Sequence, residues 1–261
     1  MSGYKEVFKR MEIKYLLSEE QYDALMPYLQ TIAKVDAYGL SKINNIYFDT
    51  PDHKLVRTSI EKPLYKEKLR LRTYGRTGND TNAFIEIKKK CSGIVYKRRI
   101  SGKYPDAYDY LIGGYRRGTF EDSQIAREIG AFMTQYKDLR PAMCICYDRV
   151  AMAGIRDAEF RVTFDSNITW NERCLDLRKV SEGRRLLADG QRLMEIKVSN
   201  AMPMELAGTL SELKIFPVSF SKYGSGYADL MRITAEQKKK RDAVAGPVGV
   251  YGFMKGEAAY V

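Results

Sequence analysis

The sequence predicts an α+β protein in which an antiparallel β-sheet has one apolar and one charged face, with helices packed on the apolar side. Segments in which charged and apolar residues alternate recur along the chain, and a strand points alternate side chains to opposite faces. Between them lie segments with apolar residues at helix spacing. The 261 residues suffice for one large domain, which we place at residues 1–241, with a C-terminal tail at 242–261.

Three neighbouring strands are predicted between residues 65 and 100, and each places charged side chains on one face. Leucines and isoleucines occupy the alternate positions, so the opposite face is apolar. A face so rich in cations indicates a polyanionic ligand. The aligned residues are Lys68, Arg70 and Arg72 in the first strand, Glu86 and Lys88 in the second, and Lys97 and Arg99 in the third.

The remaining elements follow from the same patterns. Ser18 and Gln21 have the spacing of a capping box, so a helix is expected to begin there. Residues 220–226 form a polar, glycine-containing segment that opens a last helix. This helix ends in the basic run Lys238–Arg241. We interpret this run as a solvated helix end. Further strands are expected at 8–17, 43–48, 142–152, 160–165 and 193–198, and further helices at 54–59, within 105–139, and at 204–213.

Composition limits the partners and the compartment. The formal net charge is +11, from 44 Lys and Arg against 33 Asp and Glu, which favours acidic partners such as phosphate polymers, nucleic acid or a membrane surface. No run of about 18 apolar residues suggests a transmembrane helix, and the first residues lack the apolar core of a signal peptide. We therefore expect a cytoplasmic protein.

The scarcity of histidine and cysteine restricts the chemistry. His53 is the single histidine, which excludes histidine-based metal clusters and disfavours Ser-His or Cys-His catalysis. Four cysteines in a chain of this size do not form a disulfide scaffold. Any bound metal would be held by carboxylate and phosphate oxygens, which points to Mg²⁺ or Mn²⁺.

Acidic residues recur beside the cations on three strands, and two arrangements explain this pattern. Glu12 with Lys14, Glu86 with Lys88, and Glu195 with Lys197 each share a strand face. An open sheet with one solvated face would account for part of it. The alternative is a closed barrel with a charged, water-filled interior and helices outside.

These segments, in this order, resemble the VTC domain, the polyphosphate polymerase domain of the vacuolar transporter chaperone family, within the triphosphate tunnel metalloenzymes. The resemblance covers roughly residues 8–241. It is carried by Phe8-x-Arg10-x-Glu12-x-Lys14-Tyr15, Tyr47-Phe48-Asp49, Lys68-x-Arg70-x-Arg72, Phe84-x-Glu86-x-Lys88, Tyr147-x-Arg149, Arg161-x-Thr163-x-Asp165, Glu195-x-Lys197 and Phe220-Ser221-Lys222-Tyr223.

The resemblance implies a closed antiparallel barrel of about eight strands around a tunnel that binds triphosphate. It implies that Glu195 holds a divalent metal, usually Mn²⁺. The residues expected to act on the phosphates are Lys14, Arg70, Arg72, Lys88, Arg149, Arg161 and Lys222, and those expected to bind substrate are Lys68, Lys97, Arg99, Tyr147, Lys197 and Ser221.

The function expected from this resemblance is transfer of the ATP γ-phosphate to the end of a polyphosphate chain. The alternatives are a metal-dependent triphosphatase and a non-catalytic polyphosphate binder. Arg10 stands where hydrolytic relatives carry a metal-binding acid, which favours the polymerase. Nucleic acid is disfavoured as a partner, because Phe84 is the main aromatic residue interleaved with the cations.

Several of these residues also have purely structural interpretations. Ser221 has the position of a helix cap, and Tyr147 could be a core tyrosine with its hydroxyl at the rim. Glu86 and Lys88 could form an ion pair. Asp49 follows a strand in a Thr-Pro-Asp turn and is expected to stabilise that turn rather than bind metal.

Overall fold

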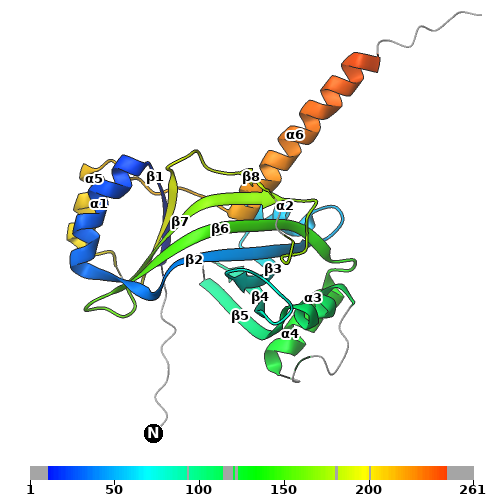
Figure 1. Cartoon of the computed structure of the whole chain (residues 1–261), viewed down its shortest axis with the longest axis horizontal. Coiled ribbons are helices and arrows are strands. Elements are labelled where there is room, and N and C mark those ends of the chain that lie inside the picture. Colours follow the sequence, from blue (N-terminus) through cyan, green and yellow to red (C-terminus); the bar gives the residue numbers. More distant parts are fainter. Residues whose placement is uncertain are drawn as a thin grey trace, which may run out of the picture. The chain divides into compact units, whose positions relative to one another are not determined.

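One curved antiparallel sheet dominates the computed structural model, which describes residues 11–92, 94–113, 120, 123–179, 182–199 and 201–245. Within these residues the strand order is β1-β9-β7-β6-β2-β3-β4-β5, and β8 pairs with β7 (Figure 1). The strands are β1 (Met11–Leu17), β2 (Ala33–Asp49), β3 (Tyr65–Tyr74), β4 (Asn82–Cys91), β5 (Ile94–Lys103), β6 (Arg140–Gly154), β7 (Arg161–Asn171), β8 (Arg184–Arg185) and β9 (Arg192–Val198).

The helices join and cover these strands. Ser18 and Gln21 form the predicted capping box: the Ser18 hydroxyl accepts from the Gln21 N–H at 3.2 Å, and the Gln21 side chain accepts from the Ser18 N–H at 3.0 Å. This confirms the predicted start of the first helix. The helices are α1 (Glu19–Ile32), α2 (Lys54–Ile60), α3 (Tyr104–Ile112), α4 (Gln124–Gln135), α5 (Met204–Glu212) and α6 (Lys222–Ala245).

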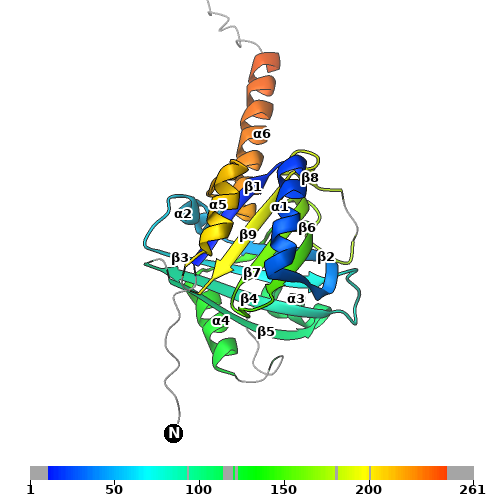
Figure 2. The same cartoon turned by 90° about the vertical axis from the view of Figure 1, so that its left-hand side faces the viewer.

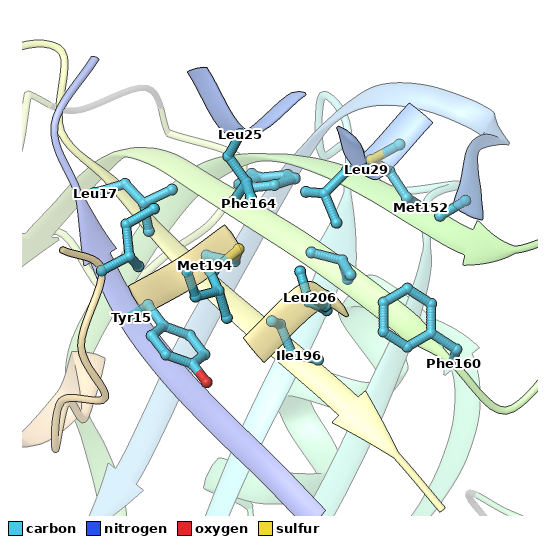
Figure 3. Packing of buried hydrophobic residues seen from close by; sticks show 14 of the residues in the cluster. Tyr15, Leu17, Leu25, Leu29, Met152, Phe160, Phe164, Met194, Ile196 and Leu206 are labelled. Atoms are coloured by element: carbon cyan, nitrogen blue, oxygen red, sulfur yellow. The ribbon is translucent and has the colours of Figure 1, made fainter. Parts of the chain in front are cut away.

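Two apolar cores lie between the sheet and its helices. In the first, Leu25 and Leu29 of α1 and Leu206 of α5 pack against Phe164 and Ile196 of the strands (Figure 3). In the second, the leucines and isoleucines of β3 and β4 pack against α3 and α4. Because both cores use the apolar residues of the alternating strands, the charged residues are left on the other face of the sheet.

Hydrogen bonds among the described residues do not close the sheet into a barrel. Among the described strands, β1 and β5 end the hydrogen-bonded order and do not pair with each other. Nevertheless, the sheet is curved strongly enough for Lys88 of β4 to lie 3.7 Å from Glu12 of β1. Figure 2 shows β1 and β9 running at a steep angle to β4 and β5. The α+β class with one antiparallel sheet is confirmed, but closure of that sheet is not.

The free edge of β1 is covered by the segment that precedes α6. Tyr15 forms a β-bridge with Pro217, and the Val218 N–H donates to the Lys14 carbonyl at 2.7 Å. This pairing satisfies part of an edge that would otherwise expose backbone groups. It also brings residues 218–222 next to the charged face. The predicted beginning of the strand at residues 8–10, including Arg10, lies outside the described residues.

Asp49 stabilises the turn after β2, as the sequence suggests. Its carboxylate accepts from the backbone N–H groups of Thr50, Leu55 and Val56 at 2.8–3.0 Å and from the Tyr223 hydroxyl at 2.8 Å. The side chain is fully buried. These bonds occupy the carboxylate and connect the start of α2 to the start of α6.

The contacts divide the chain into two units, residues 1–226 and 227–261, each described by itself. In the second unit, Arg232 pairs with Asp229 and Glu236 along α6, and Lys238–Arg241 is exposed on the helix. The domain boundary at residue 241 remains a prediction, and residues 246–261 lie outside the described part. In the described part, no helix has both the length and the apolar character needed to cross a membrane.

Candidate functional site

Strand pairing from β5 to β1 places most of the predicted site residues on one face, although the register shifts at irregularities in the β2–β6 and β6–β7 pairs. In each antiparallel pair the directly opposed residues point to the same face. Following these pairs across the sheet defines the charged face. Its paired positions are Lys97–Lys88–Lys68, Arg99–Glu86–Arg70–Tyr47, Arg72–Asn45, Tyr147–Ile43, Arg149–Asp165, Arg161–Lys197, Thr163–Glu195 and Glu195–Lys14.

Glu86 holds three cations at the centre of β3–β5. Its carboxylate lies 2.7 Å from Arg70 Nε, 3.5 Å from Arg72 Nε and 2.7 Å from Lys97 Nζ. Glu86 is only 1% exposed. Burial alone would raise its pKa, but the surrounding cations outweigh burial and lower it to about 2. The alternative ion pair between Glu86 and Lys88 is not formed among the described residues, because Lys88 pairs with Glu12.

Asp165 of β7 pairs with two further cations of the charged face, Arg149 and Lys222. It accepts two hydrogen bonds from Arg149, at 2.6 and 2.8 Å, and one from Lys222 at 2.5 Å. Burial would raise the pKa of Asp165, but Lys222 and Arg149 hold it below its usual value. Sequence reasoning did not assign this residue to the site. Strand alternation could have identified it, because Asp165 lies on the same face of its strand as Arg161.

Two tyrosine hydroxyls accept hydrogen bonds from arginines of the charged face. Arg70 donates to the Tyr47 hydroxyl at 3.2 Å, and Arg72 donates to the Tyr147 hydroxyl at 3.3 Å. Lys222 Nζ lies 4.5 Å from the centre of the Tyr147 ring. Tyr147 is therefore both buried, as the structural interpretation held, and part of the charged face.

Tyr47 was not predicted as a site residue, although it alternates with the core residues Ile46 and Phe48. Burial would raise its pKa, but Arg70 and Lys68 lower it to about 8. Its ring stacks on Tyr223 with a centroid distance of 4.6 Å. Asn45, two residues earlier, accepts from Arg72 at 2.9 Å.

Lys14 lies between the two carboxylates Glu12 and Glu195. Its Nζ is 3.9 Å from each of them, and Lys197 lies 2.9 Å from Glu195. Burial would raise the pKa of Glu195, but Lys197 and Lys14 lower it strongly. Burial lowers the pKa of Lys14, against the attraction of both carboxylates. Glu195 is thus ionised at neutral pH.

The donor chemistry here fits a hard divalent cation held by two carboxylates, with substrate phosphates and water completing the ligand set. Glu86 and Asp165 are almost fully buried in pairs that include arginines. Within the described residues Glu12 and Glu195 pair with lysines alone, which makes them the better candidates. Across the described ranges no group of three or more His, Cys, Asp or Glu residues could hold a metal by itself. Any such cation would therefore depend on the phosphate ligand.

The segment before α6 adds two groups to the face, the Ser221 hydroxyl and the Phe220 carbonyl. Lys68 donates to the Ser221 hydroxyl at 3.0 Å, and Lys14 donates to the Phe220 carbonyl at 2.9 Å. The same hydroxyl accepts from the Gly224 N–H at 3.2 Å, so Ser221 also caps the first turn of α6. Burial and the neighbouring lysines lower the pKa of Lys68 to about 8.

Two predicted residues lie at the margins of the charged face. The Arg161 side chain is 54% exposed and lies 4.0 Å from Asp36. Arg99 is exposed and lies over the Phe84 ring at 4.7 Å. The other predicted cations lie between these margins, where they outnumber the carboxylates that pair with them. The face can therefore bind a multiply charged anion through forked arginines and compact lysine charges.

The sheet, its helical cover and this face define an α+β protein with a cation-rich face on its sheet. The family model of the VTC domain matches residues 9–231, so the chain belongs to the VTC domain family. This confirms the resemblance carried by the ordered motifs. A comparison with curated proteins finds no match.

Similar solved structures share little sequence with this chain. A candidate adenylate cyclase from Vibrio parahaemolyticus is 12% identical, covering 83% of this chain and 96% of that one, with a TM-score of 0.45. A candidate adenylyl cyclase from Hippeastrum, described as having a dominant triphosphatase activity, is 16% identical, covering 84% and 96%, with a TM-score of 0.48. The Mimivirus capping enzyme triphosphatase is 7% identical, covering 79% and 89%, with a TM-score of 0.33. Because these TM-scores are low, assignment to the family rests on the VTC match.

Proposed function

We propose that the chain is a polyphosphate polymerase that transfers the γ-phosphate of ATP to the end of a polyphosphate chain. The observation that carries this proposal is the register that gathers the cations of β1, β3–β7 and β9 on one face, in a member of the VTC domain family. A linear polyanion would lie along such a face and form charge-assisted hydrogen bonds with successive cations.

The reaction proposed needs no general base. The acceptor is a terminal phosphate oxygen that is already anionic, so nothing has to remove a proton from it. The obstacle is charge repulsion between donor and acceptor, which Arg70, Arg72 and Arg149 would relieve by binding the phosphate oxygens in fixed positions. Glu86 and Asp165 would act as positioning residues, since they hold these guanidinium groups before substrate arrives.

The lysines would supply adaptable point charges. Lys14, Lys68 and Lys97 carry lowered pKa values because partial loss of solvent and neighbouring cations disfavour their charged forms, and a bound phosphate would favour those forms. A divalent cation bound through Glu195 and Glu12 would neutralise phosphate charge as it develops. The preference for Mn²⁺ is part of the proposal.

Product analysis tests the proposal. The wild-type protein is incubated with ATP, Mn²⁺ and a short polyphosphate primer, and the products are resolved by gel. We expect ADP together with chains longer than the primer. Phosphate release without chain growth would identify a triphosphatase, with water as acceptor. Absence of turnover with any triphosphate would indicate a polyphosphate-binding module.

A further inference from the structure

Two aromatic side chains continue the charged face at one end of β3 and β4. Tyr74 follows Arg72 on the same face, and Phe84 is the register partner of Arg72. The rings of Tyr74 and Phe84 lie edge to face, with centroids 5.7 Å apart. Tyr74 is 42% exposed, and Phe84 is partly buried. This pair is called the aromatic end of the charged face.

Arginines lie against both rings. The Arg99 guanidinium carbon is 4.7 Å from the centre of Phe84, and that of Arg72 is 6.0 Å from the centre of Tyr74. Neither ring is part of the two apolar cores, which use the neighbours Ala83 and Ile85 on the opposite face. Packing in the apolar cores therefore does not explain why these two rings lie on the charged face.

The order of side chains along the strands gives the face a direction. β3 presents Lys68, Arg70, Arg72 and then Tyr74, and β4 presents Lys88, Glu86 and then Phe84. Successive positions on one face are roughly 6.6 Å apart along a strand. Thus a flat, apolar group would sit one position beyond a phosphate bound at Arg72. A nucleotide has this arrangement, with a stacking base at one end and charges at the other.

We propose that Tyr74, Phe84 and Arg99 bind the base of a nucleoside triphosphate whose phosphates extend along Arg72, Arg70 and Lys68. This inference rests on the proposed function, because it requires triphosphate on the charged face. Stacking on aromatic and guanidinium planes accepts any base, since every base has a π-face. The site therefore takes adenine and guanine nucleotides with similar affinity.

Paired titrations separate the base from the phosphates. Calorimetry measures binding of the β,γ-imido analogue of ATP and of inorganic tripolyphosphate to wild type, Tyr74→Ala and Phe84→Ala. Loss of a stacking ring weakens nucleotide binding by roughly 5- to 150-fold and leaves tripolyphosphate affinity within about twofold. Phe84→Tyr keeps a stacking ring and retains nucleotide affinity. Tyr96→Ala, on the outer face of β5, is the control and changes neither ligand.

The outcomes distinguish this inference from the proposed function. Unchanged nucleotide affinity in both alanine variants would overturn the base site and leave the phosphate site intact. An equal loss for both ligands would also overturn it, because the rings would then support the phosphate site rather than the base. If the wild-type chain bound neither ligand, the proposed function would fall and the base site with it.

Discussion

Glu86 and Arg70 form an ion pair of 2.7 Å in which the carboxylate is almost completely removed from solvent. A pair of this kind contributes little net stability as a unit, but removing one partner leaves the other charge buried and uncompensated. Here one carboxylate serves three cations, so its loss affects Arg72 and Lys97 as well. Glu86 therefore sets the geometry of the charged face in the absence of ligand.

Glu86→Gln is expected to lower the free energy of unfolding by roughly 3–5 kcal/mol, the cost of breaking a buried ion pair. Urea unfolding measures this decrease. Glu128→Gln is the control, because Glu128 pairs with Arg98 near the surface, and its free energy of unfolding should fall by no more than about 1 kcal/mol. Tripolyphosphate should restore part of the lost stability, since it supplies negative charge to the same cations. Equal small losses in the two variants would contradict a central role for Glu86.

The same carboxylate predicts acid sensitivity. Its pKa is about 2 in the folded chain and close to 4.5 when exposed, so the unfolded state takes up the proton first as pH falls. The stabilisation is present above pH 4.5 and is lost between pH 4.5 and 2. The free energy of unfolding, measured by urea titration, should fall over this range by roughly 3 kcal/mol more in wild type than in Glu86→Gln.

Arg70→Ala is expected to weaken tripolyphosphate binding by roughly 1.5–3 kcal/mol, the range for a hydrogen bond to a charged group. Arg70→Lys keeps the charge but loses the forked geometry, so it should recover only part of the affinity. Calorimetric titration at fixed salt measures both variants. Lys239→Ala, in the exposed run on α6, should match wild type. Equal affinities for wild type and Arg70→Ala would remove Arg70 from the site.

Thr163 offers a test in which stability and binding change in opposite directions. Its side chain is buried on the charged face beside Glu195, and its hydroxyl has no hydrogen-bond partner within the described residues. Replacing an unsatisfied hydroxyl by an isosteric methyl is neutral or stabilising. We expect Thr163→Val to unfold at equal or higher urea concentration and to bind tripolyphosphate about 1.5–3 kcal/mol more weakly.

Thr73→Val is the matched control for this prediction. Thr73 is also buried but lies on the opposite face of β3, where its hydroxyl is 2.6 Å from that of Thr77. Removing it strands the Thr77 hydroxyl, which should cost about 1–3 kcal/mol of stability without affecting binding. If Thr163→Val behaved like Thr73→Val, its hydroxyl would have a structural partner rather than a ligand.

Lysine ionisation predicts how binding depends on pH. Burial lowers the pKa of Lys68 to about 8, and burial likewise lowers that of Lys97 to about 8 despite its pair with Glu86. These lysines are charged below pH 8 and lose their protons above it, so tripolyphosphate affinity should fall from pH 7 to 9, by up to about tenfold per pH unit for each lysine. Lys68→Arg, which stays charged, should flatten the profile. A profile independent of pH would contradict the contribution of these lysines.

Strand alternation was sufficient to predict much of this face. The spacing of Lys68, Arg70 and Arg72 determines that they point the same way whatever the rest of the chain does, because the period of a strand is two. The core residues Leu69 and Leu71 follow from the same rule. The capping box at Ser18 is equally local.

The parts that escaped prediction depend on pairing between distant segments. Asp165 and Lys222 lie 57 residues apart, and their contact requires the segment before α6 to lie along β1. Closure of the sheet is decided by its overall twist and by its edge strands, which no single segment specifies. Tyr47 was missed because a tyrosine beside core residues also fits an apolar interior.

Glu195 separates binding from turnover. It lies among cations, where a carboxylate opposes phosphate binding unless it also holds a divalent metal. Glu195→Gln keeps the shape and removes the charge. The variant should therefore bind the imido analogue of ATP without metal at least as well as wild type, because the arginines remain and a negative charge is gone. Its apparent affinity for Mn²⁺ should fall at least about tenfold, and Mn²⁺-dependent turnover should be lost.

Calorimetry without metal, followed by a Mn²⁺ titration of activity, measures the two effects in one preparation. Glu12→Gln should shift the Mn²⁺ titration in the same direction, since Glu12 is the second carboxylate next to Lys14. Glu212→Gln, exposed in α5, should leave both measurements unchanged. Full Mn²⁺-dependent turnover in Glu195→Gln would show that the carboxylate serves Lys14 and Lys197 rather than a metal. Loss of metal-free nucleotide binding would show instead that Glu195 maintains the arrangement of the cations, because removing its charge alone should strengthen the attraction for phosphate.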